Sequence, residues 1–573
     1  MVKKRILIVS SCALIYFNAC NFNKSVDTST IATDSLSISQ GKTLFLQNCS
    51  SCHTFRQDAI GPQLGGVTSA VSADWIKNYI KDPKSIIESG DDRAGKLHEK
   101  YKTLMPSFSH YSDDEINSII AFLNTQKAPD RLEALEDIEI KNPIPQPIPL
   151  SDLIIDLELV TQIPPSGEAP LLTRIAKLDI QPNTEKLFIL DLRGKLYSLT
   201  KKSPGIYLDM AKERPDFINE PGLGTGFGSF AFHPEFADNG LLYTTHTESR
   251  TSKKADFNYD DSIQVTLQWV LSEWKSNKPL SPAFSGVKRE LLRIDMVTGI
   301  HGVQEITFNP LSKPADDDYG LLYIGVGDGG SVENNYSFLA HSTEKIWGTI
   351  LRIDPSGRNS SNGQYGIPQN NPFAKSDNAK ELKEIYAYGF RNPHRITWSK
   401  SGQMLACNIG HGNLESINLV LPGHDYGWPI REGTFLVNPF GDLNKLYSLP
   451  ANDSIFNVTY PVAQYDHDDG KAINGGVEYW GTTISSLMGK FLFGDIANGR
   501  LFYIEMSDIK LGSQAPIKEW QVSVNGVPKT ILELCGTNRA DLRFGRCHNG
   551  EVYLFTKPDG KVYRLMRPSV MKK

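Results

Sequence analysis

The chain has 573 residues, too many for one hydrophobic core, so two or more domains are expected. Charged residues make up 22% of the chain and apolar residues 40%, as in ordinary soluble globular proteins. The net charge of −5 and the pI near 6.2 give no sign of the concentrated basic surface that nucleic-acid-binding proteins carry. No nucleic-acid partner is expected.

Residues 1–20 have the pattern of an export signal. Three basic residues precede the apolar run 6–17, which is too short to span a bilayer stably. The run leads into Phe-Asn-Ala-Cys, ending at Cys20, which resembles the lipobox of bacterial lipoproteins although its first two residues are unusual there. Cleavage before Cys12 would leave an apolar run of only about four residues, and plain secretion is the other alternative. We expect export to the bacterial periplasm or cell envelope, with a lipid on Cys20 as the only membrane anchor.

A flexible tether and a small all-α unit are expected next. Residues 21–37 are rich in Ser, Thr, Asn and Asp, which favours a tether. Residues 38–127 are predicted to form a compact helical domain whose last helix begins at a capping box, Ser112 with Glu115. Apolar residues then recur at helical spacing and predict one buried face: Ile116, Ile119, Ile120 and Leu123.

The helical domain contains the sequence Cys49-Ser50-Ser51-Cys52-His53. Two cysteines at this spacing reach the two vinyl groups of haem, and the histidine that follows binds the iron. A thioredoxin-type pair would need a βαβ context, and a zinc site would need a further cysteine pair; the sequence has neither. We expect haem c, attached through Cys49 and Cys52 and ligated by His53.

The second iron ligand is expected further along the domain. Met105 stands in Leu-Met-Pro-Ser-Phe just before the last helix, which resembles small class I cytochromes c, where a Met-Pro turn occupies this place. Gly61-Pro62 resembles the segment of that family whose proline carbonyl orients the haem-ligating imidazole. His110 is the alternative ligand, and an ordinary core role is the alternative for Met105. A His/Met pair leaves no open position on the iron and suits electron transfer.

A proline-rich linker, 128–154, is expected between the domains. Four prolines alternate with other residues in 143–149, which favours an extended, semi-rigid spacer. From 155 to 568 the sequence changes to short apolar β-type runs between turn residues. A Gly-x-Leu-Tyr phrase or a close variant begins at Gly194, Gly240, Gly320, Gly550 and Gly560. Such repetition suggests an all-β propeller, although periodicity alone leaves a sandwich or barrel open.

Residues 155–568 resemble the soluble PQQ-dependent glucose dehydrogenase and sorbosone dehydrogenase family. The resemblance implies a six-bladed β-propeller. The matching segments follow one another through the whole domain: residues 230–236, 323–330, 348–354, 388–393, 426–429, 474–477 and 541–545. A shared fold does not establish function, which depends on the site.

The resemblance implies a dehydrogenase that oxidises an aldose sugar or a related aldehyde or polyol. His301 matches the catalytic base and Asp328 its supporting carboxylate, with the polar loop 311–319 lengthening the interval between them. A carboxylate bonded to one ring nitrogen fixes the tautomer and raises the basicity of the other nitrogen. An ordinary surface histidine is the alternative for His301.

The same resemblance implies PQQ and calcium as cofactors. Arg391 and Asn392 match residues that contact the quinone, and an arginine there stabilises developing negative charge. Arg539 and Arg543 lie where the family places arginines against the PQQ carboxylates. Gly410 and His411 match the pair whose backbone carbonyls hold calcium, a role that requires no particular side chain. Electrons would pass through the haem to an external acceptor, such as a cytochrome or a quinone-linked chain.

The sequence departs from the family at two positions. A family glutamine that contacts the quinone aligns with Gly224, and a family lysine that pairs with PQQ aligns near Ala497. Both losses put the affinity for PQQ in doubt. His467 either lines the substrate mouth or belongs to a solvated loop, and His233 is interpreted as a structural turn residue.

Two other functions remain open at this point. One is a carbohydrate- or surface-binding propeller that has lost PQQ, since hedgehog-interacting proteins use this scaffold for binding; the other is a calcium-dependent hydrolase. An oxidising compartment would permit a Cys535–Cys547 disulfide, but the sequence does not establish the pairing.

Overall fold

The computed structural model describes residues 31–567 except 50–52, 54, 56, 59–60, 102–104, 106, 129–132, 135–138, 169–170, 200–202, 222–223, 251, 260–261 and 548. Cys20 and Cys52 lie outside the described residues, as does most of the expected tether. The described chain divides into two compact units, one of residues 31–42 and 64–128 and the other of 43–63 and the remainder to 567. Within the described residues, no helix combines the length and apolar character needed to cross a membrane.

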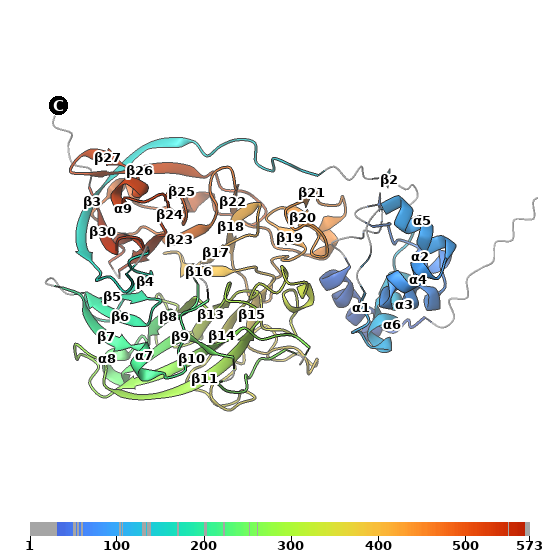
Figure 1. Cartoon of the computed structure of the whole chain (residues 1–573), viewed down its shortest axis with the longest axis horizontal. Helices are drawn as coiled ribbons and strands as arrows, with labels where there is room; N and C mark the ends of the chain where they lie inside the picture. The colour runs from blue at the N-terminus through green and yellow to red at the C-terminus, as the bar shows by residue number, and fades with distance from the viewer. Residues whose placement is uncertain are drawn as a thin grey trace, which may run out of the picture. The chain divides into compact units, whose positions relative to one another are not determined.

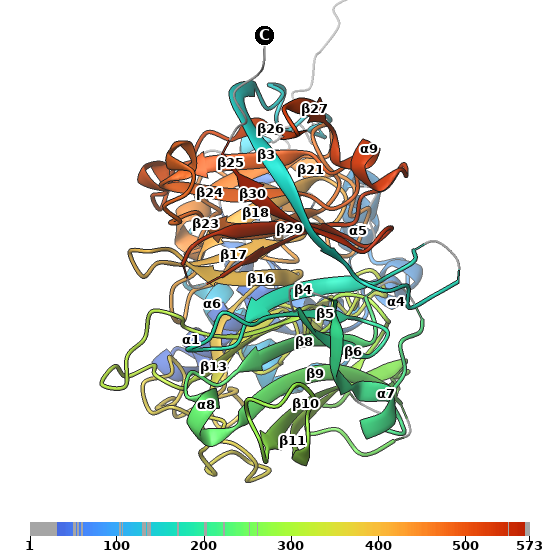
Figure 2. The same ribbon diagram turned by 90° about the vertical axis from the view of Figure 1, so that its left-hand side faces the viewer.

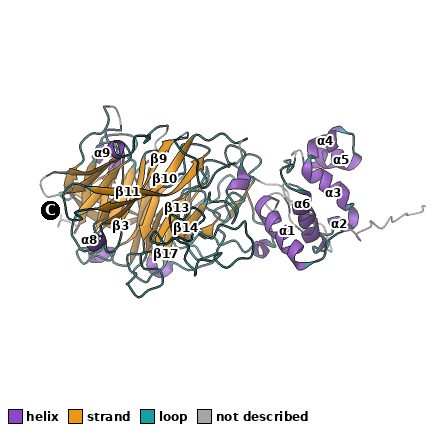
Figure 3. Cartoon of the chain, turned by 90° about the horizontal axis from the view of Figure 1, so that it is seen from below, coloured by secondary structure: helices purple, strands orange, loops and turns teal. Residues whose placement is uncertain are grey.

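The N-terminal part of the chain is helical, as predicted (Figure 3). Its helices are α1 (Ser35–Asn48), α2 (Val67–Ala70), α3 (Ala73–Lys81), α4 (Pro83–Glu88), α5 (Asp92–Tyr101) and α6 (Asp113–Asn124).

Helix α6 confirms the predicted capping box. Ser112 accepts the amide of Glu115, and the Glu115 carboxylate accepts the amide of Ser112 at 2.8 Å. All four residues of the predicted apolar face are buried. α1 approaches α6 so closely that a Cβ on Gly41 would lie 1.8 Å from the carbonyl oxygen of Ser118. This glycine therefore permits the contact between the two helices.

The remainder of the chain is β-rich (Figure 1). Its described strands include four antiparallel four-stranded sheets and a nine-stranded sheet that contains two further antiparallel groups of four, which makes six such groups. The first three groups are β4–β7 (Ile175–Ile180, Leu187–Asp191, Lys195–Leu199, Gly205–Asp209), β8–β11 (Phe227–Phe232, Leu241–Ser249, Leu267–Ser276, Gly286–Met296) and β12–β15 (Glu305–Phe308, Leu322–Val326, Thr349–Ile353, Ile385–Tyr388).

The other three groups complete the β-rich part. They are β16–β18 with β22 (Pro393–Trp398, Met404–Asn408, Leu414–Leu419, Ala463–Asp466), β23–β26 (Ile473–Glu478, Lys490–Asp495, Leu501–Glu505, Lys518–Val524) and β28–β30 with β3 (Leu542–Arg546, Val552–Thr556, Lys561–Met566, Leu150–Gln162). The smaller elements are β1 (Gln57–Asp58), β2 (Glu133–Ala134), β19 (Arg431–Glu432), β20 (Phe435–Val437), β21 (Leu446–Tyr447), β27 (Val527–Lys529), α7 (Met210–Glu213), α8 (Phe236–Asn239) and α9 (Ile531–Cys535).

The first strands of successive groups contact one another. β4 contacts β8, β8 contacts β12, β12 contacts β16, β16 contacts β23, β23 contacts β28, and β28 contacts β4. Strand β3 pairs with β30 on one side and, in parallel, with β26 on the other, so it joins the last two groups (Figure 2). Residues from the two ends of the β-rich part thus complete one sheet.

The turn glycines that the sequence singled out each precede a strand. All five have a positive φ, from 68° to 107°, a backbone conformation that favours glycine. Cys535 and Cys547 are both unpaired, so the possible disulfide is not formed. Their sulfur atoms contact Thr537 and Asn549 instead.

The proline-rich linker is bonded to the β-rich part, and this corrects the expectation of a spacer. Ile140 forms a bridge with Leu446. The amide of Ile144 donates to Asp466 Oδ2 at 3.2 Å, and that of Ile148 donates to an Asp469 carboxylate oxygen at 3.0 Å. The isoleucines between the prolines also pack against buried strand residues, which the alternating pattern alone did not indicate.

Candidate functional site

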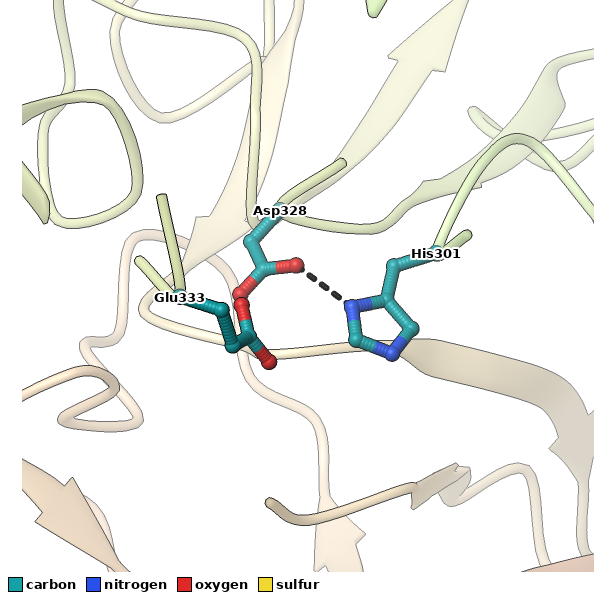
Figure 4. Close-up of side chains that lie close together, drawn as sticks. All are labelled: His301, Asp328 and Glu333. Atoms are coloured by element: carbon teal, nitrogen blue, oxygen red, sulfur yellow. Dashed lines mark hydrogen bonds and ion pairs between the residues drawn. The ribbon is translucent and has the colours of Figure 1, made fainter. Parts of the chain in front are cut away.

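The candidate site is centred on His301, four residues before the start of β12, and Asp328, two residues after the end of β13. Nδ1 of His301 lies 2.7 Å from Oδ1 of Asp328, and the other ring nitrogen, Nε2, points away from the carboxylate (Figure 4). Because a carboxylate only accepts, the proton lies on Nδ1 and Nε2 is left as the proton acceptor. The structure therefore brings together the two residues expected to form the base and its support.

Asp328 is 0% exposed and is held by several donors. The amide of Gly330 donates to Oδ1 at 2.9 Å, and the indole Nε1–H of Trp428 donates to Oδ2 at 2.9 Å. A buried carboxylate with all of these bonds stays oriented toward His301.

The backbone around His301 depends on glycine and on an unusual conformation. His301 has φ of 49°, a left-handed conformation that is unfavourable for a residue with a side chain. A Cβ on Gly327 would lie 2.2 Å from the His301 carbonyl oxygen, and one on Gly302 would lie 2.0 Å from the indole nitrogen of Trp269. The close packing of these segments places the imidazole beside Asp328.

Arg391 lies beside this pair, and its guanidinium is already engaged. Nη1 donates to the Gly410 carbonyl at 2.5 Å, and Nη2 donates to Glu333 Oε1 at 2.5 Å. The guanidinium carbon lies 5.6 Å from the centre of the Trp428 ring. The Arg391 carbonyl in turn accepts the amide of Asp328 at 2.8 Å, which ties the two segments together.

Glu333 is the acidic residue of the site that sequence analysis missed. Burial alone would raise the pKa of its carboxyl, but the hydrogen bond with His411 and the charges of Arg391 and His301 hold that pKa below its usual range. Ligand atoms of Glu333, Asp328 and His301 lie within 4.8 Å of one another, a spacing compatible with a metal ion. The guanidinium bound to Glu333 disfavours a cation there.

These residues share one end of the β-rich part. The carboxyl-terminal halves of the six first strands surround a cavity of about 620 Å³, lined among others by Ile180, Phe232, Phe308, Trp398, Val477 and Arg546. His301, Arg391 and Asp541 precede β12, β16 and β28, so they lie at the opposite end of those strands.

The other residues predicted to contact the cofactor differ from one another in burial and in hydrogen-bond partners. Asn392 is buried, and its amide donates to the Asn408 side chain at 3.0 Å. Arg539 is half exposed and pairs with Asp541 at 3.0 Å. Arg543 is buried, its Nη1 donates to the Leu542 carbonyl at 2.7 Å, and burial lowers its pKa to about 10.

His467 is not in a freely solvated loop. Its Nε2 lies 3.1 Å from Glu415 Oε1, a fully buried carboxylate that also accepts the amide of Ile473 at 2.9 Å. Burial raises the pKa of Glu415, although the bond to His467 opposes this. His233 accepts the amide of Glu235 at 3.1 Å, which agrees with the turn role expected for it.

The two departures from the family have different surroundings. Gln304, three residues after His301, donates from Nε2 to the Gly224 carbonyl at 2.7 Å. An amide side chain is therefore present beside the position where the family glutamine is missing. Ala497 accepts the amide of Ala540 at 2.9 Å and contributes no charge.

The described part of the haem motif has the expected geometry at His53. Its Nδ1 lies 2.7 Å from the Pro62 carbonyl oxygen, a contact of the kind that orients a metal-ligating imidazole. A Cβ on Gly61 would lie 2.6 Å from His53 Cε1, so the ring packs directly on that glycine. These residues fit a haem-ligating imidazole.

The other candidate haem residues differ in exposure. Cys49 and Met105 are partly buried, and His110 is exposed with its ring 4.5 Å from that of Tyr111.

No sequence pattern indicated a specific role for Glu333 or Trp428, which contact Arg391 and Asp328 respectively. Trp428 belongs to one of the segments that carried the family resemblance, so a signal was present for it. Glu333 stands in a polar loop after two glycines, and no pattern there distinguished it.

Comparisons with known proteins match two families along the chain. Residues 174–524 match the Glucose / Sorbosone dehydrogenase family, and residues 38–127 match the Cytochrome c family. The HIPL2 protein of Arabidopsis thaliana is 27% identical over 455 residues, 70% of this chain and 62% of the relative. Quinoprotein glucose dehydrogenase B of Acinetobacter calcoaceticus is 23% identical over 341 residues, 56% of this chain and 64% of the relative. The chain thus spans less than two thirds of the length of either relative.

A solved structure shares the fold of the β-rich part. The soluble aldose sugar dehydrogenase from Escherichia coli, in its apo form, superposes with a TM-score of 0.50 at 17% identity, covering 72% of this chain and 100% of the other. With the family match spanning more than half of its residues, this chain belongs to the glucose/sorbosone dehydrogenase family and carries a cytochrome c domain at its N-terminal side.

Proposed function

We propose that this protein is an exported quinohaemoprotein dehydrogenase that oxidises an aldose sugar, or a related aldehyde or polyol. Electrons pass through its own haem c to an external acceptor, a cytochrome or a quinone-linked chain, and a lipid on Cys20 holds the protein at a membrane. The observation that carries the proposal is the 2.7 Å contact of His301 with Asp328, in a family domain fused to a cytochrome c domain.

We also propose that the six strand groups are the blades of a closed six-bladed propeller. The first strands contact one another in sequence order, and the last of them, β28, contacts the first, β4, which supports this arrangement. Strand β3 completes the group of β28, β29 and β30 and thereby joins residues from both ends of the domain. The end of the propeller that carries His301, Arg391 and Asp541 would then surround the propeller axis.

His301 acts as the base in this proposal. With Nδ1 held by Asp328, Nε2 takes the proton of the substrate hydroxyl, and the buried carboxylate stabilises the imidazolium that forms. PQQ, when bound, supplies the two-electron acceptor that the side chains lack. Arg391 provides positive charge for the negative charge that develops beside His301.

The residues present fit a carboxylate-bearing cofactor better than they fit calcium. Arg543 is buried without an ion pair among the described residues and suits an anionic group, and Arg539 and Asn392 remain proposed PQQ contacts. The Gly410 carbonyl, proposed to bind calcium with that of His411, accepts Arg391 instead. Calcium could bind the Gly410 carbonyl only if Arg391 released it. We therefore assign calcium no step in the reaction.

A binding module without PQQ is the second candidate. It is favoured by the pairing of Arg391 with Glu333, which neutralises a cation expected at the quinone, and by Gly224 and Ala497. In that case the His301–Asp328 contact would be a structural remnant.

One experiment separates the candidates. The purified haem-containing protein is incubated with PQQ and calcium and screened against aldoses, aldehydes and polyols, with reduction of the haem and of an added dye as readouts. The proposal predicts reduction that needs both PQQ and substrate. Saturable sugar binding with no reduction by any substrate would establish the binding module, and hydrolysis without reduction would establish the hydrolase.

A further inference from the structure

Lys557 is a buried lysine at the site end of the β-rich part. It directly follows β29, and Thr556 pairs with Leu542 at the start of β28, so Lys557 lies at the same end as Asp541. Its side chain is 3% exposed. Within the described residues, no atom accepts a hydrogen bond from its ammonium group and no carboxylate forms an ion pair with it.

The neighbouring charges do not neutralise Lys557. Two guanidinium groups, Arg543 and Arg174, and two carboxylates, Asp541 and Asp191, act on it electrostatically. Both carboxylates are engaged elsewhere: Asp541 pairs with Arg539, and Asp191 accepts the amide of Arg174 at 3.1 Å. Burial, with repulsion from Arg543, lowers the pKa of Lys557 well below its usual value. An unpaired buried ammonium is costly, and a bound anion would remove that cost.

His394 connects this charge to the base. It stands at an irregularity in the pairing of β16 with β17, and both of its ring nitrogens are buried without a hydrogen-bond partner among the described residues. Burial and the charges of Arg543, Lys557 and His301, among others, keep its pKa well below the usual value. His394 is the second residue of β16, His301 precedes β12, and Lys557 lies level with the start of β28, so all three stand at the same end of the strands.

We propose that Lys557, with Arg543 and His394, binds a carboxylate group of the ligand that His301 acts on or beside. An ammonium, a guanidinium and a neutral imidazole offer the donors that a carboxylate accepts. The carboxylate belongs either to the quinone cofactor or to an acidic sugar substrate. The inference deepens the proposed function and rests on it only where the ligand is PQQ.

The test measures binding instead of turnover. Titration calorimetry of the full-length, haem-containing protein is performed with PQQ and, separately, with glucuronate, using glucose as the uncharged comparison. Lys557→Met preserves the length of the side chain and removes the charge. Lys518→Met, which changes an exposed lysine of β26, is the matched control.

The Lys557→Met variant should bind at least one of the two carboxylates about 10- to 100-fold more weakly, the range of one charge-assisted hydrogen bond. Lys518→Met should bind as the unmodified protein does. The variant should also melt no lower than the unmodified protein without ligand, because it replaces a buried amine, which makes no hydrogen bond among the described residues, by an apolar group.

The two carboxylate arms keep this inference distinct from the proposed function. Loss of glucuronate binding in Lys557→Met supports the inference even if PQQ never binds. Equal affinities of the variant and the unmodified protein for both carboxylates, or no binding of either by the unmodified protein, would overturn it. A lower melting temperature with unchanged affinities would make Lys557 structural.

Discussion

Arg391 Nη2 lies 2.5 Å from Glu333 Oε1, so the cation beside the candidate base is held by a carboxylate. Glu333 therefore orients the guanidinium while its Oε2 is buried without a partner among the described residues.

Glu333 should act as a positioning residue for Arg391. Glu333→Gln retains an oxygen that accepts the Arg391 bond and should retain turnover within about threefold, whereas Glu333→Ala should lose about tenfold or more, since a hydrogen bond to a charged group contributes about 1.5–3 kcal/mol. Steady-state kinetics of the PQQ-loaded enzyme and thermal melting of each variant provide the measurement. Equal loss in both variants, with unchanged melting, would show that the charge and not the orientation matters.

His301 should carry the base function. His301→Ala should lose at least about 10²-fold in turnover, the effect expected of a positioned general base. PQQ binding, measured by calorimetry, should remain. His467→Ala is the matched control, since His467 also contacts a buried carboxylate, Glu415. Should His467→Ala lose turnover while His301→Ala does not, the base has been misassigned.

The haem ligands can be assigned spectroscopically. Replacing Cys49 and Cys52 by Ala should abolish the acid-acetone-resistant haem, because no thioether bonds remain. Met105→Ala should remove the weak sulfur-to-iron absorption band of a His/Met haem. If the haem spectrum changes in His110→Ala and stays unchanged in Met105→Ala, His110 is the second iron ligand.

The raised pKa of Glu415 predicts a specific pH dependence of stability. Burial, its main cause, favours the protonated form in the folded state. The stabilising contribution is thus fully present below the unfolded value near 4.5 and is lost as pH rises through the folded pKa. Glu415→Gln removes this titration. The melting temperature of the variant minus that of the unmodified protein should therefore increase as pH rises from the unfolded to the folded pKa of Glu415. A difference independent of pH would contradict the assignment.

The docked linker should depend on two aspartates. Asp466→Ala with Asp469→Ala removes the acceptors for the Ile144 and Ile148 amides and should make residues 139–149 more susceptible to limited proteolysis. Asp468→Ala is the control, as an exposed neighbour in the same turn. Unchanged cleavage in the double variant would mean that the apolar contacts of the isoleucines suffice.

The parts predicted from the sequence are those that depend on local spacing. The capping box of Ser112 and Glu115 and the turn glycines are fixed by neighbours in the chain, and both were confirmed. His301 and Asp328 are 27 residues apart, and only the family resemblance paired them.

The remaining features require contacts between distant segments. Glu333 meets Arg391 and Trp428 meets Asp328 across 58 and 100 residues, and no local pattern encodes such contacts. The proline-rich segment predicted extension, but its docking depends on Asp466 and Asp469, more than 300 residues away.

The central claim is that the site reduces the haem of the same molecule. The haem and the site belong to one chain, in which residues 139–149 are docked on the β-rich part. Linkage within one chain sets an effective concentration in roughly the millimolar range. Haem reduction is then followed by stopped-flow absorbance after substrate is added to the PQQ-loaded protein, at several protein concentrations. The account predicts a rate independent of protein concentration; a rate that rises in proportion to it would show transfer between molecules and contradict the account.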